Sequence, residues 1–266
     1  MFSGIFFRSV RRPRPLRSNE KNWLEDRVKA AGSRVLITGA AKRVGAELAR
    51  TFASAGARVL VHCNRSREEA ERLVEELGGE KAGHGVVCCD LSSPENLPEL
   101  MEQLPEDLSV LVNNASVFLR EDIEKESLRS AERQFAINFW SPVELMRLFF
   151  EKSTAPELSV VNLLDQAIRK TPRDSFSYLL SKKSLAEATR AAALHYAPRM
   201  RVNGLAPGPV FPPPGLEHLR MEKTLKTIPL GRPVNPNDLA EACLFLAMNS
   251  SITGETLFVD CGQSLL

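Results

Sequence analysis

The fold is decided by RVLITGAAKRVG, residues 34–45. Its apolar first part is typical of strands that are covered on both faces. Gly39 then permits a tight turn, and Gly45 permits a helix to pack closely on the strand. The start of such a helix offers free backbone N–H groups to a phosphate. The stretch therefore predicts a strand, a glycine-rich turn and a phosphate-binding helix, although glycine-rich turns also occur in α/β proteins that bind no phosphate.

The alternation of strand and helix continues to the end of the chain. Strands are expected at residues 34–38, 58–62, 85–89, 109–112, 158–164, 201–205 and 256–259, and helices at 46–55, 67–77, 97–104, 128–150, 181–197 and 238–248. This order favours parallel pairing through right-handed crossovers. The sequence therefore predicts a single doubly wound (Rossmann) α/β domain, a parallel sheet with helices on both faces. Its ligand should lie at the carboxyl ends of the strands.

Basic residues are concentrated at the N-terminus. Residues 1–32 contain eight Lys and Arg against three Asp and Glu, whereas the rest of the chain contains 27 and 30. We expect 1–32 to be a basic, disordered extension and 33–266 to be the catalytic domain. An organelle transit peptide is the alternative for the arginine-rich start. The mildly acidic body gives no support to a nucleic-acid-binding surface.

The composition excludes several classes of protein. The chain has 266 residues, 43% hydrophobic and 26% charged, which is typical of globular proteins. No run approaches the ~18 apolar residues that a membrane-spanning helix needs. The five cysteines form no CxxC or Cys/His cluster, so neither a disulfide framework nor a bound metal is expected. Buried thiols suit a reducing compartment, and we expect a cytoplasmic protein without a membrane partner.

The end of the second strand indicates the cofactor. It reads His62-Cys63-Asn64-Arg65-Ser66 and lacks the acid that would bind an adenosine ribose and repel a 2′-phosphate. Arg65 and Ser66 offer donors to such a phosphate, and Lys42 approaches from the first turn. This favours NADP(H) over NAD(H), although Arg65 could instead open a solvated helix. Asp90, which ends the third strand, either meets the adenine amine or caps the next helix.

Candidate catalytic residues follow the fifth strand. Tyr178 and Lys182 are four residues apart, so they share one face of a helix. A nearby ammonium group stabilises phenolate and lowers the tyrosine pKa, which suits a general acid near neutral pH. Such a pair is common by chance on exposed helix faces. However, the chain has only two tyrosines, and this one lies where a Rossmann ligand is expected.

Together, the motifs resemble the short-chain dehydrogenase/reductase family from about Ser33 to Ser264. They are the TGxxxxxG-type turn, Asn113-Asn114-Ala115-Ser116, Asn138, Tyr178 with Lys182, Arg201-Val202-Asn203, Pro207-Gly208 and Val259-Asp260-Cys261-Gly262. The resemblance implies that Tyr178 is the catalytic acid and that Lys182 binds the ribose and tunes the tyrosine. It also implies that Asn138 supports a proton-relay water, and that the protein is a homotetramer.

The resemblance also implies a set of cofactor-binding residues at the strand ends. They are Gly39, Lys42, Arg43, Val44, Gly45, His62, Asn64, Arg65, Ser66, Asp90, Leu91, Asn114, Ala115, Ser116, Tyr178, Lys182, Pro207, Gly208 and Val210. Asn114 and Ala115 would line the cofactor pocket, and Val210 would lie near the nicotinamide amide.

Three departures from the family pattern narrow the interpretation. Arg43 replaces a usual glycine, Asp165 replaces the serine thirteen residues before the tyrosine, and Phe211-Pro212-Pro213-Pro214 replaces the usual threonine. The first two departures are shared by the pteridine reductases. That branch also carries TGAAKR, an HxxRS-type strand end and NNAS followed by a phenylalanine. This chain has each of them, with Phe118 as the phenylalanine.

The chemistry of Asp165 favours the same branch. An ionised carboxylate beside a developing alkoxide is repulsive, so Asp165 suits ketone reduction only when it is protonated. Reduction of a C=N bond in a pterin instead needs a proton on nitrogen and acceptors for ring N–H groups. We expect the substrate to meet Arg43, Ser116, Phe118, Asp165 and Tyr178. Phe118 would stack on the pterin plane, with core packing as the alternative.

The sequence thus predicts an NADPH-dependent reductase of pterins or folates, which transfers a hydride to a C=N bond. The catalytic residues would be Tyr178, Lys182, Asp165 and Asn138. The alternatives are a carbonyl reductase acting on ketones or 3-oxoacyl groups and a catalytically idle NADP-binding protein. The apolar residues of the 128–150 helix (Leu145, Met146, Leu148, Phe149 and Phe150) favour a partner subunit, or a helix packed on both sides within one chain.

Overall fold

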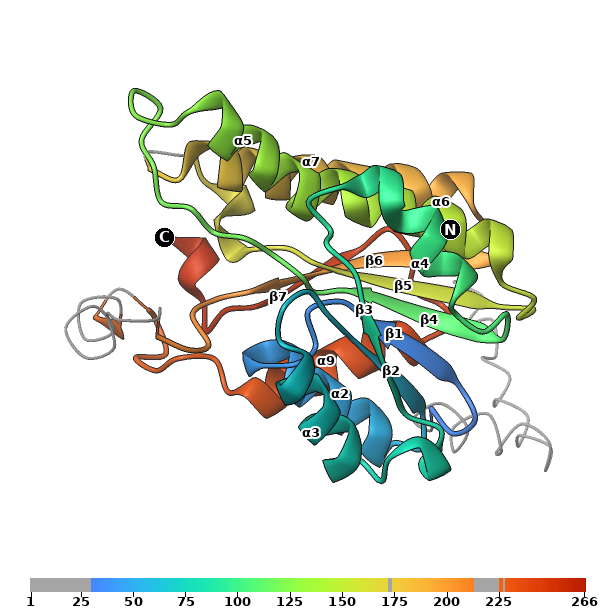
Figure 1. Cartoon of the computed structure of the whole chain (residues 1–266). Coiled ribbons are helices and arrows are strands. Elements are labelled where there is room, and N and C mark those ends of the chain that lie inside the picture. The colour runs from blue at the N-terminus through green and yellow to red at the C-terminus, as the bar shows by residue number, and fades with distance from the viewer. Residues whose placement is uncertain (1–29, 172–173, 213–224, 227) are drawn as a thin grey trace, which may run out of the picture.

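The computed structural model describes residues 30–171, 174–212, 225–226 and 228–266. Within these residues the chain forms one seven-stranded parallel sheet in the order β3-β2-β1-β4-β5-β6-β7 (Figure 1). The strands are β1 (Arg34–Ile37), β2 (Arg58–Cys63), β3 (Gly85–Cys88), β4 (Leu108–Asn113), β5 (Leu158–Leu163), β6 (Met200–Pro207) and β7 (Thr256–Val259). The predicted doubly wound fold is confirmed.

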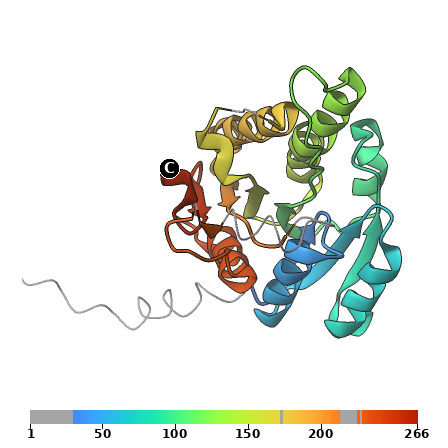
Figure 2. The same ribbon diagram turned by 90° about the vertical axis from the view of Figure 1, so that its left-hand side faces the viewer.

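Helices cover both faces of the sheet. The α-helices are α2 (Arg43–Ser54), α3 (Arg67–Glu76), α4 (Leu97–Glu102), α5 (Leu128–Phe135), α6 (Ser141–Lys152), α7 (Phe176–His195) and α9 (Pro236–Met248). Short turns are η2 (Glu80–Ala82), η3 (Pro94–Asn96), η4 (Ala136–Trp140), η5 (Gln166–Arg169) and η6 (Gln263–Leu265). Helices α4 to α7 lie on one side of the sheet, and α2, α3 and α9 lie on the other (Figures 1 and 2).

The central strands are buried on both faces, which explains their apolar sequence. In β1, Val35 and Ile37 pack into the cluster beneath α2 and α9, whereas Leu36 packs into the cluster beneath α4 and α6. All three side chains are fully buried. Because successive side chains of a strand point to opposite faces, a strand covered on both sides has to be apolar throughout.

The strand order places the carboxyl ends of β1 and β4 at the switch point of the sheet. The chain runs from β1 outward to β2 and β3, and β4 then pairs with the other side of β1. Crossovers on either side of this point diverge, so a crevice opens above the strand ends. The Gly39 turn follows β1 and the Asn114 segment follows β4, which brings both motifs to this crevice.

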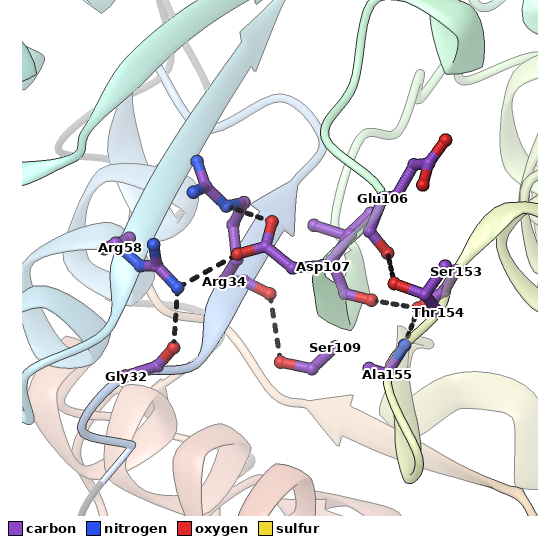
Figure 3. Close-up of polar contacts among 10 residues, drawn as sticks. Gly32, Arg34, Arg58, Glu106, Asp107, Ser109, Ser153, Thr154 and Ala155 are labelled. Atoms are coloured by element: carbon purple, nitrogen blue, oxygen red, sulfur yellow. Dashed lines mark hydrogen bonds and ion pairs between the residues drawn. The ribbon is translucent and has the colours of Figure 1, made fainter.

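At the amino ends of the strands, opposite the crevice, charged side chains form ion pairs between adjacent strands. Asp107, directly before β4, pairs with Arg34 of β1 at 2.7 Å and with Arg58 of β2 at 3.1 Å (Figure 3). Nearby, the Thr154 backbone N–H donates to the Glu106 carbonyl at 2.8 Å. Partly exposed ion pairs of this kind contribute about 0.2–1 kcal/mol each. They hold the starts of three adjacent strands, whose other ends form the crevice.

Two helices differ from the sequence prediction. The predicted 128–150 helix is divided into α5, the π-helical turn η4 and α6. Pro142 has no N–H to donate to the carbonyl of Asn138 four residues earlier, and a wider turn accommodates that gap. Helix α7 begins at Phe176, five residues before the predicted start, so Tyr178 lies in its first turn.

The described residues also bear on the predictions about the apolar helix residues, the cysteines, membrane-spanning helices and the N-terminal extension. Leu145, Met146 and Phe149 are buried inside the chain, so their apolar character needs no partner subunit. All five cysteines are free thiols. None of the described helices is long and apolar enough to cross a membrane. The expected extension 1–32 lies outside the described residues as far as residue 29, and Ala30 is already buried in the core.

Candidate active site

A cavity of about 790 Å³ opens at the carboxyl ends of the strands. It brings together most of the residues selected from the sequence: Gly39, Lys42, Arg43, Val44, Gly45, His62, Asn64, Asp90, Leu91, Asn114, Ala115, Ser116, Phe118, Asp165, Tyr178, Lys182, Pro207 and Gly208. Four predicted residues are not part of its lining, namely Arg65, Ser66, Asn138 and Val210.

The glycine-rich turn has no room for side chains. Gly39 adopts a φ of +62°, and a Cβ there would lie 2.9 Å from the Ala115 Cα. A Cβ on Gly45 would lie 2.3 Å from the carbonyl oxygen of Gly39. The turn therefore passes closely over the segment after β4, and the N–H groups of Gly39 and Ala40 both donate to His62.

Arg43 occupies a backbone conformation that favours glycine. Its φ is +55°, in the left-handed region that costs a non-glycine residue about 1–2 kcal/mol. Its guanidinium donates to the carbonyl of Pro212 at 3.2 Å and lies 5.3 Å from the ring centre of Phe211. Arg43 therefore reaches across the cavity to the segment after β6, and Phe211 rather than the predicted Val210 lines that wall.

His62 supports the turn from below. Its Nδ1 accepts a hydrogen bond of 3.1 Å from the Gly39 backbone N–H, and its Nε2 lies 3.2 Å from the carbonyl of Cys89. Burial lowers the pKa of His62 to about 4. The ring is therefore neutral at physiological pH, with Nε2–H as the donor to Cys89, and it fixes the turn to the ends of β2 and β3.

The end of the cavity beside α3 carries both signs of charge. Lys42 forms an ion pair with Glu69 of α3, with 2.6 Å between Nζ and Oε1. Asp90 lines the cavity and also accepts a hydrogen bond of 2.9 Å from the Ser92 N–H, which lowers the pKa of its carboxyl. Arg65 is exposed just beyond this lining. A 2′-phosphate arriving here would meet Arg65 and compete with Glu69 for Lys42.

Tyr178 and Asp165 form a buried hydrogen-bonded pair. The Tyr178 hydroxyl donates to Oδ2 of Asp165 at 2.8 Å, and Oδ1 accepts from the Ala167 N–H at 2.7 Å. Burial raises the pKa of the Asp165 carboxyl. Burial, followed by the charge of Asp165, raises the pKa of the Tyr178 phenol well above its ordinary value.

This result corrects the expectation that Lys182 lowers the tyrosine pKa. The Lys182 Nζ donates to the carbonyl of Leu163 at 2.7 Å and is almost fully buried. Loss of hydration lowers the pKa of Lys182 to about 8. The carboxylate of Asp165 is hydrogen-bonded to the phenol, and its effect on Tyr178 therefore exceeds that of the ammonium group.

Asn138 lies behind the cavity wall. Its Oδ1 accepts from the Val117 N–H at 2.9 Å and from the Ser116 hydroxyl at 3.0 Å. Its Nδ2 donates to the Val117 carbonyl at 2.9 Å and to the Ser181 hydroxyl at 3.2 Å. The side chain thus holds the segment after β4 against α7, within the wide turn η4.

Phe118 stands at the cavity wall beside Tyr178. The two rings meet edge to face with 4.7 Å between their centres. Phe118 is 50% exposed, which argues against the alternative of core packing. An exposed aromatic ring at a cavity is available for stacking on a flat ligand.

Other lining residues were not selected from the sequence: Val117, Arg133, Ile137, Leu163, Leu164, Gln166, Pro209, Phe211 and Gln263. Those next to Asp165 and Phe118 could have been found, because they adjoin predicted site residues. Arg133 and Gln263 carried no such signal, since the packing of α5 and η6 alone brings them to the cavity.

The family model described as enoyl-(acyl carrier protein) reductase matches residues 39–264. Glucose 1-dehydrogenase of Gluconobacter oxydans is 31% identical, over 88% of this chain and 93% of that protein. L-xylulose reductase of Mus musculus is 31% identical, over 87% of this chain and 96% of that protein.

Solved structures extend the comparison. FolM alternative dihydrofolate reductase 1 of Brucella canis, complexed with NADP, superimposes with a TM-score of 0.80 at 33% identity, over 89% of this chain and 96% of that one. The corresponding protein of Brucella suis, also in complex with NADP, gives a TM-score of 0.78 at 32% identity, over 88% and 96%. The chain therefore belongs to the short-chain dehydrogenase/reductase family of oxidoreductases.

Proposed function

We propose that this chain is an NADPH-dependent reductase of pterins or folates that reduces a C=N bond of a dihydropterin-type ring. The observation that carries the proposal is the buried hydrogen bond between Tyr178 and Asp165 at the cavity. The similarity to two FolM alternative dihydrofolate reductases supports it. The pair offers one oxygen that gives a proton and another that accepts one, which a C=N bond within a pterin ring requires.

The cavity fits a dinucleotide. Gly39 and Gly45 let the turn and the first turn of α2 pack tightly against the chain's own backbone, and the start of α2 would then receive a pyrophosphate. Arg65 and Lys42 would hold the 2′-phosphate, and Lys182 would bind the ribose. NADPH supplies a hydride when it is bound, and the FolM structures complexed with NADP support this cofactor.

Tyr178 and Asp165 would supply the proton that the ring nitrogen of the substrate takes up. The Tyr178 phenol holds its proton at neutral pH and can donate it, although burial and the Asp165 charge raise its pKa and so make it a weaker acid. The raised pKa of Asp165 lets its carboxyl hold a proton at higher pH than an ordinary aspartate does. Whichever group faces the ring nitrogen can protonate it, and the other can accept a hydrogen bond from a ring N–H.

Phe118 would orient the flat substrate. Its half-exposed ring stands edge to face with Tyr178, so a pterin stacked on Phe118 lies beside the phenol. Arg43, on the other wall, would bind the pterin carbonyl or a cofactor phosphate, and Ser116 would complete the substrate site. Both donors are within the same cavity lining.

Carbonyl reduction is the second candidate. The sugar reductases and dehydrogenases among the relatives favour it. A protonated Asp165 could donate to a carbonyl oxygen as the usual serine does, and its raised pKa makes that form more accessible. A catalytically idle protein is disfavoured because Tyr178, Asp165 and Lys182 all line one cavity and Tyr178 is hydrogen-bonded to Asp165.

The proposal is tested by NADPH oxidation with dihydrobiopterin, dihydrofolate, L-xylulose and an acetoacetyl thioester in parallel. We expect the highest kcat/KM with one of the two dihydropterins. A preference for L-xylulose or the thioester would replace this proposal with carbonyl reduction. Absence of turnover with all four, together with tight NADPH binding, would favour the idle protein.

We also propose a homotetramer located in the cytoplasm. Trp140 in η4 is 55% exposed, Leu194 in α7 85% and Phe245 in α9 52%, so these large apolar side chains lie at the surface rather than in the core. The five free thiols are in line with a reducing compartment. Light scattering at micromolar concentration should give four times the chain mass of 29.5 kDa, and a monomer would contradict the assembly.

A further inference from the structure

The start of α7, which carries Tyr178 in its first turn, lacks a cap of its own. Ser175 at the N-cap position has a φ of +59°, and its side chain makes no capping hydrogen bond. The first turn of α7 also contains no acidic residue. The first backbone N–H groups of a helix have no partner within the helix, and buried ones need acceptors from elsewhere.

Those acceptors come from the segment after β4, about 50 residues earlier in the chain. The Glu121 carbonyl accepts from the N–H of Ser175 at 3.0 Å and of Phe176 at 3.4 Å. Oε2 of Glu126 accepts from the Ser177 N–H at 3.2 Å and from the Ser177 hydroxyl at 2.7 Å. A carboxylate at this position also suits the positive end of the helix dipole.

The other oxygen of Glu126 is bonded to Gln134, which contacts the backbone next to Phe118. Oε1 accepts from the Gln134 side-chain N–H at 2.7 Å, and Oε1 of Gln134 accepts from the Leu119 backbone N–H at 3.1 Å. Gln134 and Ser177 are both buried. One carboxylate therefore links the backbone next to Phe118 with the helix start next to Tyr178.

We propose that Glu126 is a positioning residue for the reaction, which sets the relation between the Phe118 platform and the Tyr178 phenol. This inference rests on the proposed function, in which those two rings hold and protonate the substrate. A carboxylate accepts all three donors that meet at Glu126. An amide has one acceptor oxygen, and its NH₂ group would face at least one of these donors, leaving it unpaired.

The first test compares Glu126→Gln with Glu124→Gln, an exposed residue of the same segment. The substrate is the one that the wild-type protein reduces fastest in the panel above. Glu126→Gln should lower kcat by about 10- to 100-fold, because small displacements of reacting groups have effects of that size. The Kd for NADPH should stay within about twofold, since Glu126 is not part of the cavity lining. Glu124→Gln should match wild type in both.

A rescue separates positioning from general destabilisation. In the double variant Glu126→Gln with Gln134→Glu, the amide at position 126 can donate to the carboxylate at position 134 while its oxygen still accepts from Ser177. The donors and acceptors then match again, and kcat should recover by at least fivefold relative to Glu126→Gln. Ser177→Ala, which removes one of the three donors, should give an intermediate kcat and serves if Glu126→Gln does not fold.

Hydrogen exchange of the free protein makes the inference independent of the substrate. Glu126→Gln should accelerate exchange in the peptides covering 117–127 and 174–180, and Glu124→Gln should not. If the wild-type protein reduced none of the four substrates, the proposed function would fail. The exchange result would still decide whether Glu126 links the segment after β4 to the start of α7. Unchanged exchange, or a wild-type kcat in Glu126→Gln, overturns the inference.

Discussion

The Tyr178 hydroxyl donates to a carboxylate, Oδ2 of Asp165, at 2.8 Å. Burial raises the pKa of both groups; the Asp165 charge raises that of Tyr178 further, whereas the hydrogen bond from Tyr178 opposes the rise at Asp165. The ammonium of Lys182 is engaged with the Leu163 carbonyl instead. In the proposed function, proton delivery is therefore assigned to the Tyr178–Asp165 pair, and Lys182 acts on it through its charge on Asp165.

Tyr178→Phe removes the phenol from this pair without changing the ring that meets Phe118. Reduction of both dihydropterins and ketones should fall by about 10²–10⁴-fold, the usual effect of losing a general acid. The Kd for NADPH, measured by fluorescence titration, should stay within about twofold. Retention of more than a tenth of the wild-type kcat would show that Tyr178 is not the acid.

Arg65→Asp tests the predicted 2′-phosphate contact. The change removes a charge-assisted donor and adds a repulsive charge, so the Kd for NADPH should rise by about 10- to 100-fold. The Kd for NADH should change little. Arg72→Asp is the matched control, since Arg72 is an exposed arginine of α3 that pairs with Glu68. A preference for NADPH that survives Arg65→Asp would place the phosphate elsewhere.

Glu69→Gln should strengthen NADPH binding. In the structure Lys42 is held by Glu69 at 2.6 Å, and a bound phosphate would have to compete for that ammonium group. A partly exposed ion pair is worth up to about 1 kcal/mol, so freeing Lys42 should lower the Kd by up to about fivefold. Glu68→Gln, whose partner is Arg72, should leave the Kd unchanged. Weaker NADPH binding in Glu69→Gln would exclude Lys42 from the phosphate site.

His62 should make the stability of the fold depend on pH. Its pKa is about 4 in the folded protein and 6.5 when unperturbed, so the unfolded chain binds the proton more readily. Stability should therefore be complete above pH 6.5 and fall as the pH drops toward 4. The loss attributable to His62 should reach about 3 kcal/mol, since its ring is 1% exposed.

His62→Asn provides the comparison. The asparagine oxygen can still accept from the Gly39 N–H, but the side chain does not titrate in this range. The free energy of unfolding is measured with urea at several pH values between 4 and 7. Plotted against pH, it should rise less steeply for the variant than for wild type. Equal slopes would mean that His62 is protonated with an ordinary pKa.

The parts of the site that could be predicted from the sequence are set by local spacing. Gly39 lies two residues after the end of β1, and Gly45 is the third residue of α2. The four-residue spacing of Tyr178 and Lys182 fixes their common helix face. The parallel sheet followed from the alternation of apolar runs and helical periods. Each of these features can be predicted without knowing which segments that are distant in the sequence come into contact in the fold.

The parts of the fold and the site that could not be predicted depend on contacts between segments that are distant in the sequence. Ser175 makes no capping hydrogen bond, and the early start of α7 is supported instead by Glu121 and Glu126, which lie far away in the sequence. The direction of the Tyr178 pKa shift was wrong because the sequence does not show that Lys182 turns to a carbonyl. Pro142 does indicate a break in the helix near η4, but the helical spacing of apolar residues across 128–150 led to the prediction of one continuous helix.

The central claim is that Asp165 adapts the family's catalytic site to C=N reduction. The most direct test measures kcat/KM with NADPH for dihydrobiopterin, dihydrofolate and L-xylulose, in wild type and in Asp165→Ser. Asp165→Ser restores a neutral donor beside the phenol, so it removes the second proton-handling group and the charge that opposes an oxyanion.

We predict that the wild-type protein prefers a dihydropterin and that Asp165→Ser lowers this activity by about 10²–10⁴-fold. Binding of NADPH should be unchanged, and weak reduction of L-xylulose should become measurable. Unchanged turnover of the dihydropterin by a folded Asp165→Ser protein would contradict the account.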